Sequence, residues 1–200
     1  MMNPIRMLRY VTHRSDTWHA LAEEKPSVMK MLWGYIVPMS LIPPVMLNIV
    51  ARNHPKIFMD ILPGDRPLIV GLILFVALVA GVLVMAWISK FLAEMVDLKP
   101  SFRDALLVIA VAATPFWVAS ICYLIPNLAL NLVLHGVAGV FSVALVYQGI
   151  LTIFHLHRRG AAAMLTTAIG CTGAIGFGVL LVGMLMTWGV IQDLQFAVKA

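Results

Sequence analysis

The chain has 200 residues, of which 62% are hydrophobic and only 12% are charged, and its formal net charge is +5. A soluble domain carries about 25% charged residues and roughly half apolar ones, so this composition excludes a protein whose main solvent is water. The basic residues lie beside apolar segments and accompany no reading motif, so we expect no nucleic-acid partner.

Residues 1–27 form a first segment that we expect on the cytoplasmic side of a membrane. Apolar residues recur in it at helical spacing, while Arg6, Arg9 and Arg14 lie mostly off that face. One interpretation is an amphipathic helix on the inner leaflet, with the three arginines binding anionic lipid. The other is a partly ordered tail whose arginines only fix the topology. No apolar run precedes Glu23, so we expect no cleavable signal peptide.

Apolar segments long enough to cross a bilayer fill residues 28–192. A hydrocarbon core of about 30 Å needs about 20 helical residues. Unpaired backbone groups cost several kcal/mol each in lipid, so such spans must be helices. The sequence therefore predicts an all-α, polytopic membrane protein with five transmembrane helices, followed by a short external tail at residues 193–200. The predicted spans are residues 28–51, 68–89, 105–125, 128–154 and 161–191.

The distribution of Lys and Arg predicts the orientation. Cytoplasmic loops carry an excess of these residues. If the N-terminus is cytoplasmic, the outer side receives only Arg52, Lys56, Arg66 and Lys199 of the 14 Lys and Arg residues. We therefore expect a cytoplasmic N-terminus and an external C-terminus.

Prolines are expected to bend two of the spans. Pro38, Pro43 and Pro44 lie in the first span and Pro115 lies in the third. Each removes a backbone donor and clashes with the carbonyl one turn earlier. A broken helix can expose carbonyls to a transported solute, or neighbouring helices can accommodate a simple bend, which we favour. The Thr114 hydroxyl is placed to satisfy a freed carbonyl.

Polar residues follow one face of the fourth span near its outer end. Asn127, Asn131 and His135 are spaced by four residues, so their side chains share a helix face. Ionisable residues inside a membrane are costly and often functional. Asn131 and His135 could therefore line a pocket, whereas capping of the turn explains Asn127 and accounts in part for Asn131.

A second polar cluster follows the fourth span at its inner end. His155 and His157 are two residues apart and point in different directions on a helix, and no third ligand lies nearby in the sequence, so we expect no metal site. With Arg158 and Arg159 they are better explained as positive-inside anchors, or as contacts to lipid phosphate.

The carboxylates of the inner connection, Glu94, Asp97 and Asp104, lie around Lys90, Lys99 and Arg103 and are typical of a solvated charged loop. Paired acid–base catalysis would need them to converge in a dry cleft, which their spacing does not indicate. Zinc-protease, phosphate-loop and serine-nucleophile motifs are missing from the sequence. We therefore predict no enzyme, no catalytic residue and no cofactor.

Small residues recur every fourth position in the fifth span. Thr166, Gly170, Ala174 and Gly178 lie on one face, and small residues at this spacing let helix backbones approach closely. The partner helix could belong to this chain or to another copy.

Residues 98–106 read Leu-Lys-Pro-Ser-Phe-Arg-Asp-Ala-Leu, and Ala-Thr-Pro follows at residues 113–115. Together these segments resemble the Yip (Ypt-interacting protein) domain family. The likeness is strongest to its small bacterial inner-membrane branch, and the segment that begins Asp16-Thr17-Trp18 also looks like the family's entry segment. The resemblance covers nearly the whole chain and implies five helices with a cytosolic N-terminus. The sequence departs from the family's pattern at two places. Residues 96–100 replace a glycine-rich form of the inner loop, and Val111 lies in the neighbourhood where the family frequently has a tyrosine.

These observations favour a non-enzymatic protein of the bacterial inner (plasma) membrane that organises the membrane or scaffolds protein partners. The expected partners are membrane lipids, with other membrane proteins or a second copy of the chain beside them. The alternative is a small transporter or channel with a pocket between the bent first helix and His135.

Overall fold

A computed structural model describes residues 16–24, 26–53, 66–125, 127–156 and 158–199, with side chains in the last helix described as far as Val179. The described residues form helices and no strand. Five helical stretches are long and apolar enough to cross a membrane, which confirms the predicted all-α, five-span fold. They are Val28–Asn53, Leu68–Glu94, Phe102–Leu124, Ala129–Thr152 and Arg159–Val179.

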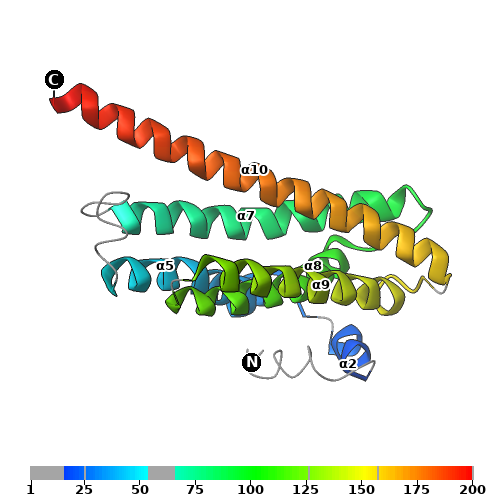
Figure 1. Ribbon diagram of the computed structural model, residues 1–200. Coiled ribbons are helices and arrows are strands. Elements are labelled where there is room, and N and C mark those ends of the chain that lie inside the picture. Colours follow the sequence, from blue (N-terminus) through cyan, green and yellow to red (C-terminus); the bar gives the residue numbers. More distant parts are fainter. Residues whose placement is uncertain (1–15, 25, 54–65, 126, 157, 200) are drawn as a thin grey trace.

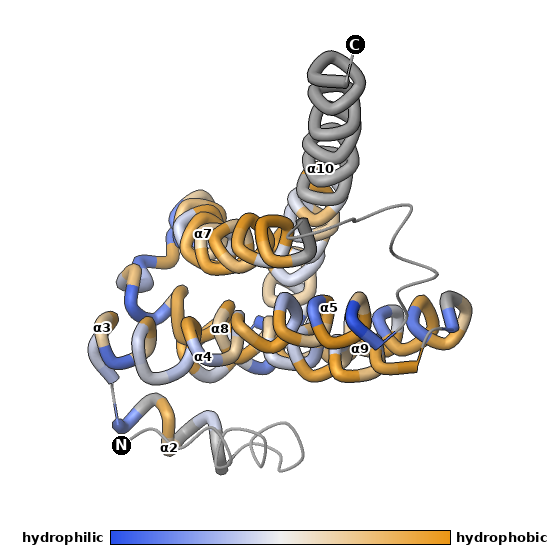
Figure 2. The backbone as a smooth tube through the Cα atoms, turned by 90° about the vertical axis from the view of Figure 1, so that its left-hand side faces the viewer, coloured by the Kyte–Doolittle hydropathy of each residue, from blue (hydrophilic) through white to orange (hydrophobic). Residues whose placement is uncertain are grey.

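The spans form two layers. The first span, α8 (Phe102–Ala119) and α9 (Leu128–Thr152) lie side by side in one layer. The second layer holds α7 (Arg66–Glu94) and α10 (Arg159–Lys199), and α10 crosses the bundle at an angle (Figures 1 and 2). The short helix α2 (Asp16–Glu24) lies outside the first layer, at the end where α7 connects to α8 and α9 to α10. We call this the α2 end of the bundle.

The first span is a series of short helical pieces: α3 (Val28–Met31), the π-helix η1 (Leu32–Ile36), α4 (Val37–Ser40) and α5 (Ile42–Asn53). The π-turns end just before Pro38, and Leu41 interrupts the helix just before Pro43 and Pro44. A proline cannot donate to the carbonyl one turn earlier, and its ring crowds that carbonyl. The helical register therefore changes at these points.

Helix α8 is the centre of the bundle. Its residues from Ala105 to Ala112 are all buried, and Ala105, Leu106 and Val108 have no exposed surface. Helix α8 packs against the first span, α7 and α9. Ser101 begins it with a side-chain cap, and it continues through Pro115 into a 3-10 turn, η2 (Ser120–Leu124).

Helix α9 lies close to α8 at Gly149. A Cβ atom at this position would lie 2.8 Å from Cγ1 of Val108 and 3.1 Å from the ring of Trp18. Such distances are shorter than van der Waals contact, so only glycine lets α8, α9 and α2 meet here without displacement. Val108 is fully buried and β-branched, which leaves it little freedom to move aside.

The outer faces of α7 and α10 are apolar and open. Leu72 and Val76 on α7, and Ile175 on α10, each expose more than half of their surface. In lipid such residues need no protein neighbour, because lipid tails are as apolar as the side chains. Helix α10 has 41 residues, which corresponds to about 62 Å. It therefore extends well past a single bilayer core, and the predicted tail at residues 193–199 is its last two turns.

Candidate functional site

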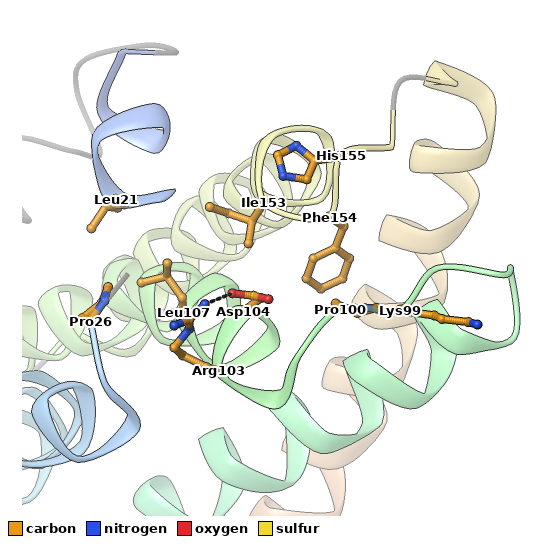
Figure 3. A pocket seen from close by; sticks show the side chains of 10 residues that line it. All are labelled: Leu21, Pro26, Lys99, Pro100, Arg103, Asp104, Leu107, Ile153, Phe154 and His155. Atoms are coloured by element: carbon orange, nitrogen blue, oxygen red, sulfur yellow. Dashed lines mark hydrogen bonds and ion pairs between the residues drawn. The ribbon is translucent and has the colours of Figure 1, made fainter. Parts of the chain in front are cut away.

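A hollow of about 230 Å³ opens at the α2 end of the bundle. Its lining comes from α2, from the connection before α8, from the first turns of α8, and from the residues that follow α9 (Figure 3). The third span begins at Phe102 and the fourth ends at Thr152, so the hollow lies where both spans leave the apolar region. It therefore occupies the level at which lipid headgroups are expected.

One wall of the hollow is apolar. Leu21, Leu107, Ile153 and Phe154 contribute to it, and all four are buried. Leu21 comes from α2 and Leu107 from α8, while the other two follow the last turn of α9. Ile153 continues the helical bonding by donating to the Gly149 carbonyl at 2.7 Å. Because these side chains also belong to the bundle core, the packing that holds the helices together fixes the wall.

The polar part of the lining is built on the N-terminus of α8. The Ser101 hydroxyl accepts a hydrogen bond from the Asp104 N–H at 3.2 Å, and the Asp104 carboxylate accepts one from the Ser101 N–H at 3.1 Å. This capping box satisfies backbone donors that the first helical turn leaves unpaired. Arg103 donates to the same carboxylate at 3.3 Å. Asp104 is thus held by its own helix end and by its neighbour.

The basic groups of the hollow differ in placement. Arg103 keeps its guanidinium next to Asp104, about one third exposed. Lys99 is exposed and extends away from that pair along the rim (Figure 3). His155 is exposed and adopts a left-handed backbone with φ 54°, which turns the chain from α9 towards α10 across the hollow. Arg103 is therefore the cation that the fold holds most firmly at this site.

Helix α2 closes one side of the hollow because it is fixed to the bundle. Trp18 and Leu21 are each only 2% exposed. The Trp18 indole N–H donates to Oε1 of Gln148 on α9 at 3.2 Å. Nine residues are too few for a stable isolated helix. Docking on the bundle therefore stabilises α2, and in this part of the N-terminal segment the apolar face meets protein, where the sequence pattern suggested lipid.

Ser101 and Asp104 form a helix cap, a role that the expected solvated charged loop does not include. The pattern Ser-x-x-Asp before an apolar run is a recognised helix-start signature and predicts this capping box. Of the two other carboxylates, Glu94 pairs with Lys90 at 3.4 Å on the exposed end of α7, and Asp97 is exposed in the turn that follows.

Asn131 and His135 lie at the other end of the bundle from the hollow. Nε2 of His135 is 3.0 Å from the Tyr123 hydroxyl, and its Nδ1 is 2.8 Å from the Asn131 carbonyl oxygen. The Asn131 side-chain amide donates to the Ile125 carbonyl at 3.1 Å. Asn127 caps α9 by accepting from the Leu130 N–H at 3.0 Å. These contacts tie η2 to the start of α9 across the turn between the third and fourth spans.

Buried hydroxyl groups join the first span to α8 in the middle of the bundle. The Tyr35 hydroxyl is hydrogen-bonded to the Thr114 hydroxyl, which is also 3.3 Å from the Ala110 carbonyl. Pro115 leaves the Val111 carbonyl without its helical donor, but the Thr114 hydroxyl bonds the Ala110 carbonyl, so the prediction that Thr114 satisfies the freed carbonyl is wrong. Tyr35 also packs edge-on against Trp117, with the ring centroids 6.0 Å apart.

The small-residue face of the fifth span is placed as follows. Gly170 lies towards α9, where an added Cβ would be 3.7 Å from Val143, an ordinary contact. Ala174 is exposed, and nothing lies within 4 Å of a Cβ at Gly178. Only the first of these positions therefore meets a helix of the same chain among the described residues, and a role for the other two in assembly stays a prediction.

Other predicted residues fall outside the described part of the chain, namely Arg6, Arg9, Arg14 and His157. Within the described ranges, no group of three or more His, Cys, Asp and Glu side chains is arranged to hold a metal ion.

Comparison with known proteins gives one match. No curated protein and no solved structure matches the chain significantly. A family model described as the Yip1 domain matches residues 8–180, which include α2, the hollow and the described parts of all five spans. The multi-pass membrane architecture and the resemblance of residues 98–106 agree with this match. The chain therefore belongs to the Yip1 domain family.

Proposed function

We propose that this protein is a non-enzymatic integral membrane protein that organises the membrane or scaffolds protein partners at its α2 end. One observation carries the proposal: α2 is docked on the bundle through Trp18, beside the two connections that leave the membrane at the same end. A docked helix presents its outer face in a fixed position. Glu23 and Glu24 are exposed on α2, where a partner can reach them.

Two sets of hydrogen-bonded side chains inside the membrane support an architectural role. Tyr35 and Thr114 bond each other, and both ring nitrogens of His135 have partners. Groups engaged in this way hold helices together. A solute pathway would instead place such groups along a water-filled cavity.

The proposed location is a bacterial inner membrane with the α2 end in the cytoplasm. The excess of Lys and Arg near this end supports that orientation. The described part of α2 and the end of α10 lie at opposite ends of the bundle (Figure 1). Reporter fusions at the two termini are expected to give opposite signals, with the N-terminal reporter active in the cytoplasm, and equal signals would contradict the proposal.

The experiment that tests the function releases α2. Replacing a buried Trp by Ala costs about 3–5 kcal/mol, so Trp18→Ala is expected to undock α2 while the spans stay folded. Hydrogen exchange of the α2 amides should accelerate by roughly a hundredfold or more. Trp33→Ala is the matched control, because Trp33 is 66% exposed on the first span. In Trp33→Ala the α2 amides should exchange at the same rate as in the natural chain.

The functional measurement compares the same two variants in cells. Membrane morphology by electron tomography and the set of cross-linked neighbours are expected to change with Trp18→Ala and to stay constant with Trp33→Ala. Charge reversal of Arg6, Arg9 and Arg14 to Glu tests the proposed lipid contact of the N-terminal segment in the same assays. If both measurements are unaltered in Trp18→Ala and in the charge-reversed chain, the proposal fails.

A further inference from the structure

We propose that the hollow at the α2 end binds the phosphate headgroup of an anionic phospholipid, with Arg103 as the principal phosphate donor. The inference rests on the proposed function, since it names the lipid partner of the same end of the bundle. It assigns that contact to a built site in the fold, separate from the three arginines of residues 1–15.

Position is the first argument. The polar wall lies just before and within the first turn of the third span, and Ile153 and Phe154 follow the last residue of the fourth. A lipid phosphate lies at the same depth, at the boundary between the hydrocarbon and the water. A phospholipid in the surrounding leaflet therefore reaches the hollow without leaving its own layer.

Charge is the second argument. Arg103 and Lys99 line the hollow, and Asp104 is the one carboxylate among the described lining residues. That carboxylate already accepts hydrogen bonds from the Ser101 N–H, from its hydroxyl at 2.6 Å and from Arg103. Arg103 has five N–H donors in a planar fork that matches phosphate oxygens. Among the described residues Arg103 uses one of these N–H donors to bond Asp104, so the other donors are available to an anion.

Shape and wall chemistry are the third argument. A cavity of this kind needs at least about 10–15 Å³ to hold one water molecule, so a hollow of about 230 Å³ has room for a group of several atoms such as a phosphate ester. Leu21, Leu107 and Phe154 form a wall that offers nothing to a free inorganic anion. The glycerol and ester carbons of a lipid bury apolar surface against such a wall. The combination of a cationic wall and an apolar wall therefore selects a phospholipid over soluble phosphate.

The net charge of the lipid is the last step. Arg103, Lys99 and the exposed His155 line the hollow. The ammonium group of a zwitterionic lipid bound there would lie near the basic side chains of Arg103 and Lys99 and be repelled by them. A lipid such as phosphatidylglycerol brings only the negative phosphate and neutral hydroxyls. The hollow is therefore expected to prefer phosphatidylglycerol to phosphatidylcholine.

The test uses the full chain, delipidated in a neutral detergent. Native mass spectrometry gives the dissociation constants of dioleoyl-phosphatidylglycerol and dioleoyl-phosphatidylcholine. We expect the anionic lipid to bind about tenfold more tightly, and Arg103→Gln to remove about a factor of ten from that affinity alone. The matched control is Lys30→Gln, which removes one exposed charge near the start of the first span, outside the hollow. The affinity of this control variant for the anionic lipid should stay within about twofold of that of the natural chain.

A second variant keeps the test decisive if Arg103→Gln does not fold. Asp104→Asn retains an oxygen for the capping box and removes the negative charge beside Arg103, so it should bind the anionic lipid as tightly as the natural chain or more tightly. Equal losses in Arg103→Gln and Lys30→Gln would show diffuse attraction and overturn the site. A loss in folded Asp104→Asn would overturn it too.

Soluble competitors identify the source of the phosphate. Inorganic phosphate and glycerophosphoglycerol should displace the lipid only at concentrations far above those at which phosphatidylglycerol binds. If inorganic phosphate competes as well as the lipid does, the occupant is a soluble anion and the lipid assignment is wrong. These binding results are independent of the cellular assays for α2, so loss of one proposal leaves the other measurable.

Discussion

Helices α7 and α8 are both strongly apolar, yet they lie in opposite surroundings. Every residue of α8 from Ala105 to Ala112 is buried in protein, whereas α7 exposes Leu68, Leu72 and Val76 along its length. In water these two sequences would both be core helices. In a membrane, hydrophobicity gives no preference between a protein neighbour and a lipid neighbour. Packing shape and a few hydrogen bonds therefore decide which apolar helix becomes the centre.

The largest expected effect compares the same substitution on the two helices. Leu106 on α8 has no exposed surface and Leu72 on α7 is 62% exposed. Leu106→Ala opens a cavity and should lower the free energy of unfolding by about 2–5 kcal/mol. Leu72→Ala should change it by less than about 0.5 kcal/mol. Titration with sodium dodecyl sulfate in mixed micelles, followed by circular dichroism, measures both. Equal midpoints would break the distinction between the two helices.

A smaller effect is expected from adding one methyl group where α9 meets α8. Gly149→Ala places a Cβ within 3 Å of both methyl groups of Val108 and should cost about 1–3 kcal/mol by overpacking. Gly81→Ala on α7 is the control, because nothing lies within 4 Å of its new Cβ. Alanine favours helix over glycine, so this chain should be as stable as the natural one or slightly more stable. A loss in the control, or none at Gly149, contradicts the close approach.

The smallest expected effect concerns the hydrogen bond that holds the first span on α8. Tyr35→Phe and Thr114→Val each remove one of the two hydroxyls, and together they form a double-mutant cycle. Hydrogen bonds between membrane helices couple by about 0.6 kcal/mol on average, and we expect that order here. The same detergent titration measures the three variants. Strictly additive changes would mean that the bond contributes nothing to the choice of α8 as the central helix.

The length and number of the spans were predictable because they follow from the thickness of the bilayer. The predicted third span, residues 105–125, corresponds to Phe102–Leu124, and Asn127 caps the helix α9 that follows. The Asn127 cap was also predicted, since asparagine at such a position has a local role. The cap and the span lengths both depend on short stretches of sequence, so both can be predicted from such stretches alone.

The hollow was not predictable, because its walls come from residues that are distant in sequence. Leu21, Arg103 and Phe154 meet only after three helices have packed. Periodicity shows that α2 has an apolar face, but a lipid surface and a protein surface select the same pattern. The sequence left open whether this face binds lipid or belongs to a partly ordered tail, and the structure instead buries Trp18 against α9. Inside lipid, hydropathy also gives no sign of which face of α8 or α7 is covered.

The close contact at Gly149 links the surface helix α2 to the packed spans. Here a segment from the beginning of the chain, one from its middle and one from its later part touch at a single backbone position. A side chain added at this junction would be felt at once by the packed spans and by Trp18, which anchors the surface helix. A displacement of α2 and a displacement of the packed spans would therefore both act on this contact. Substitution of residue 149 is a way to change how strongly α2 is coupled to the spans.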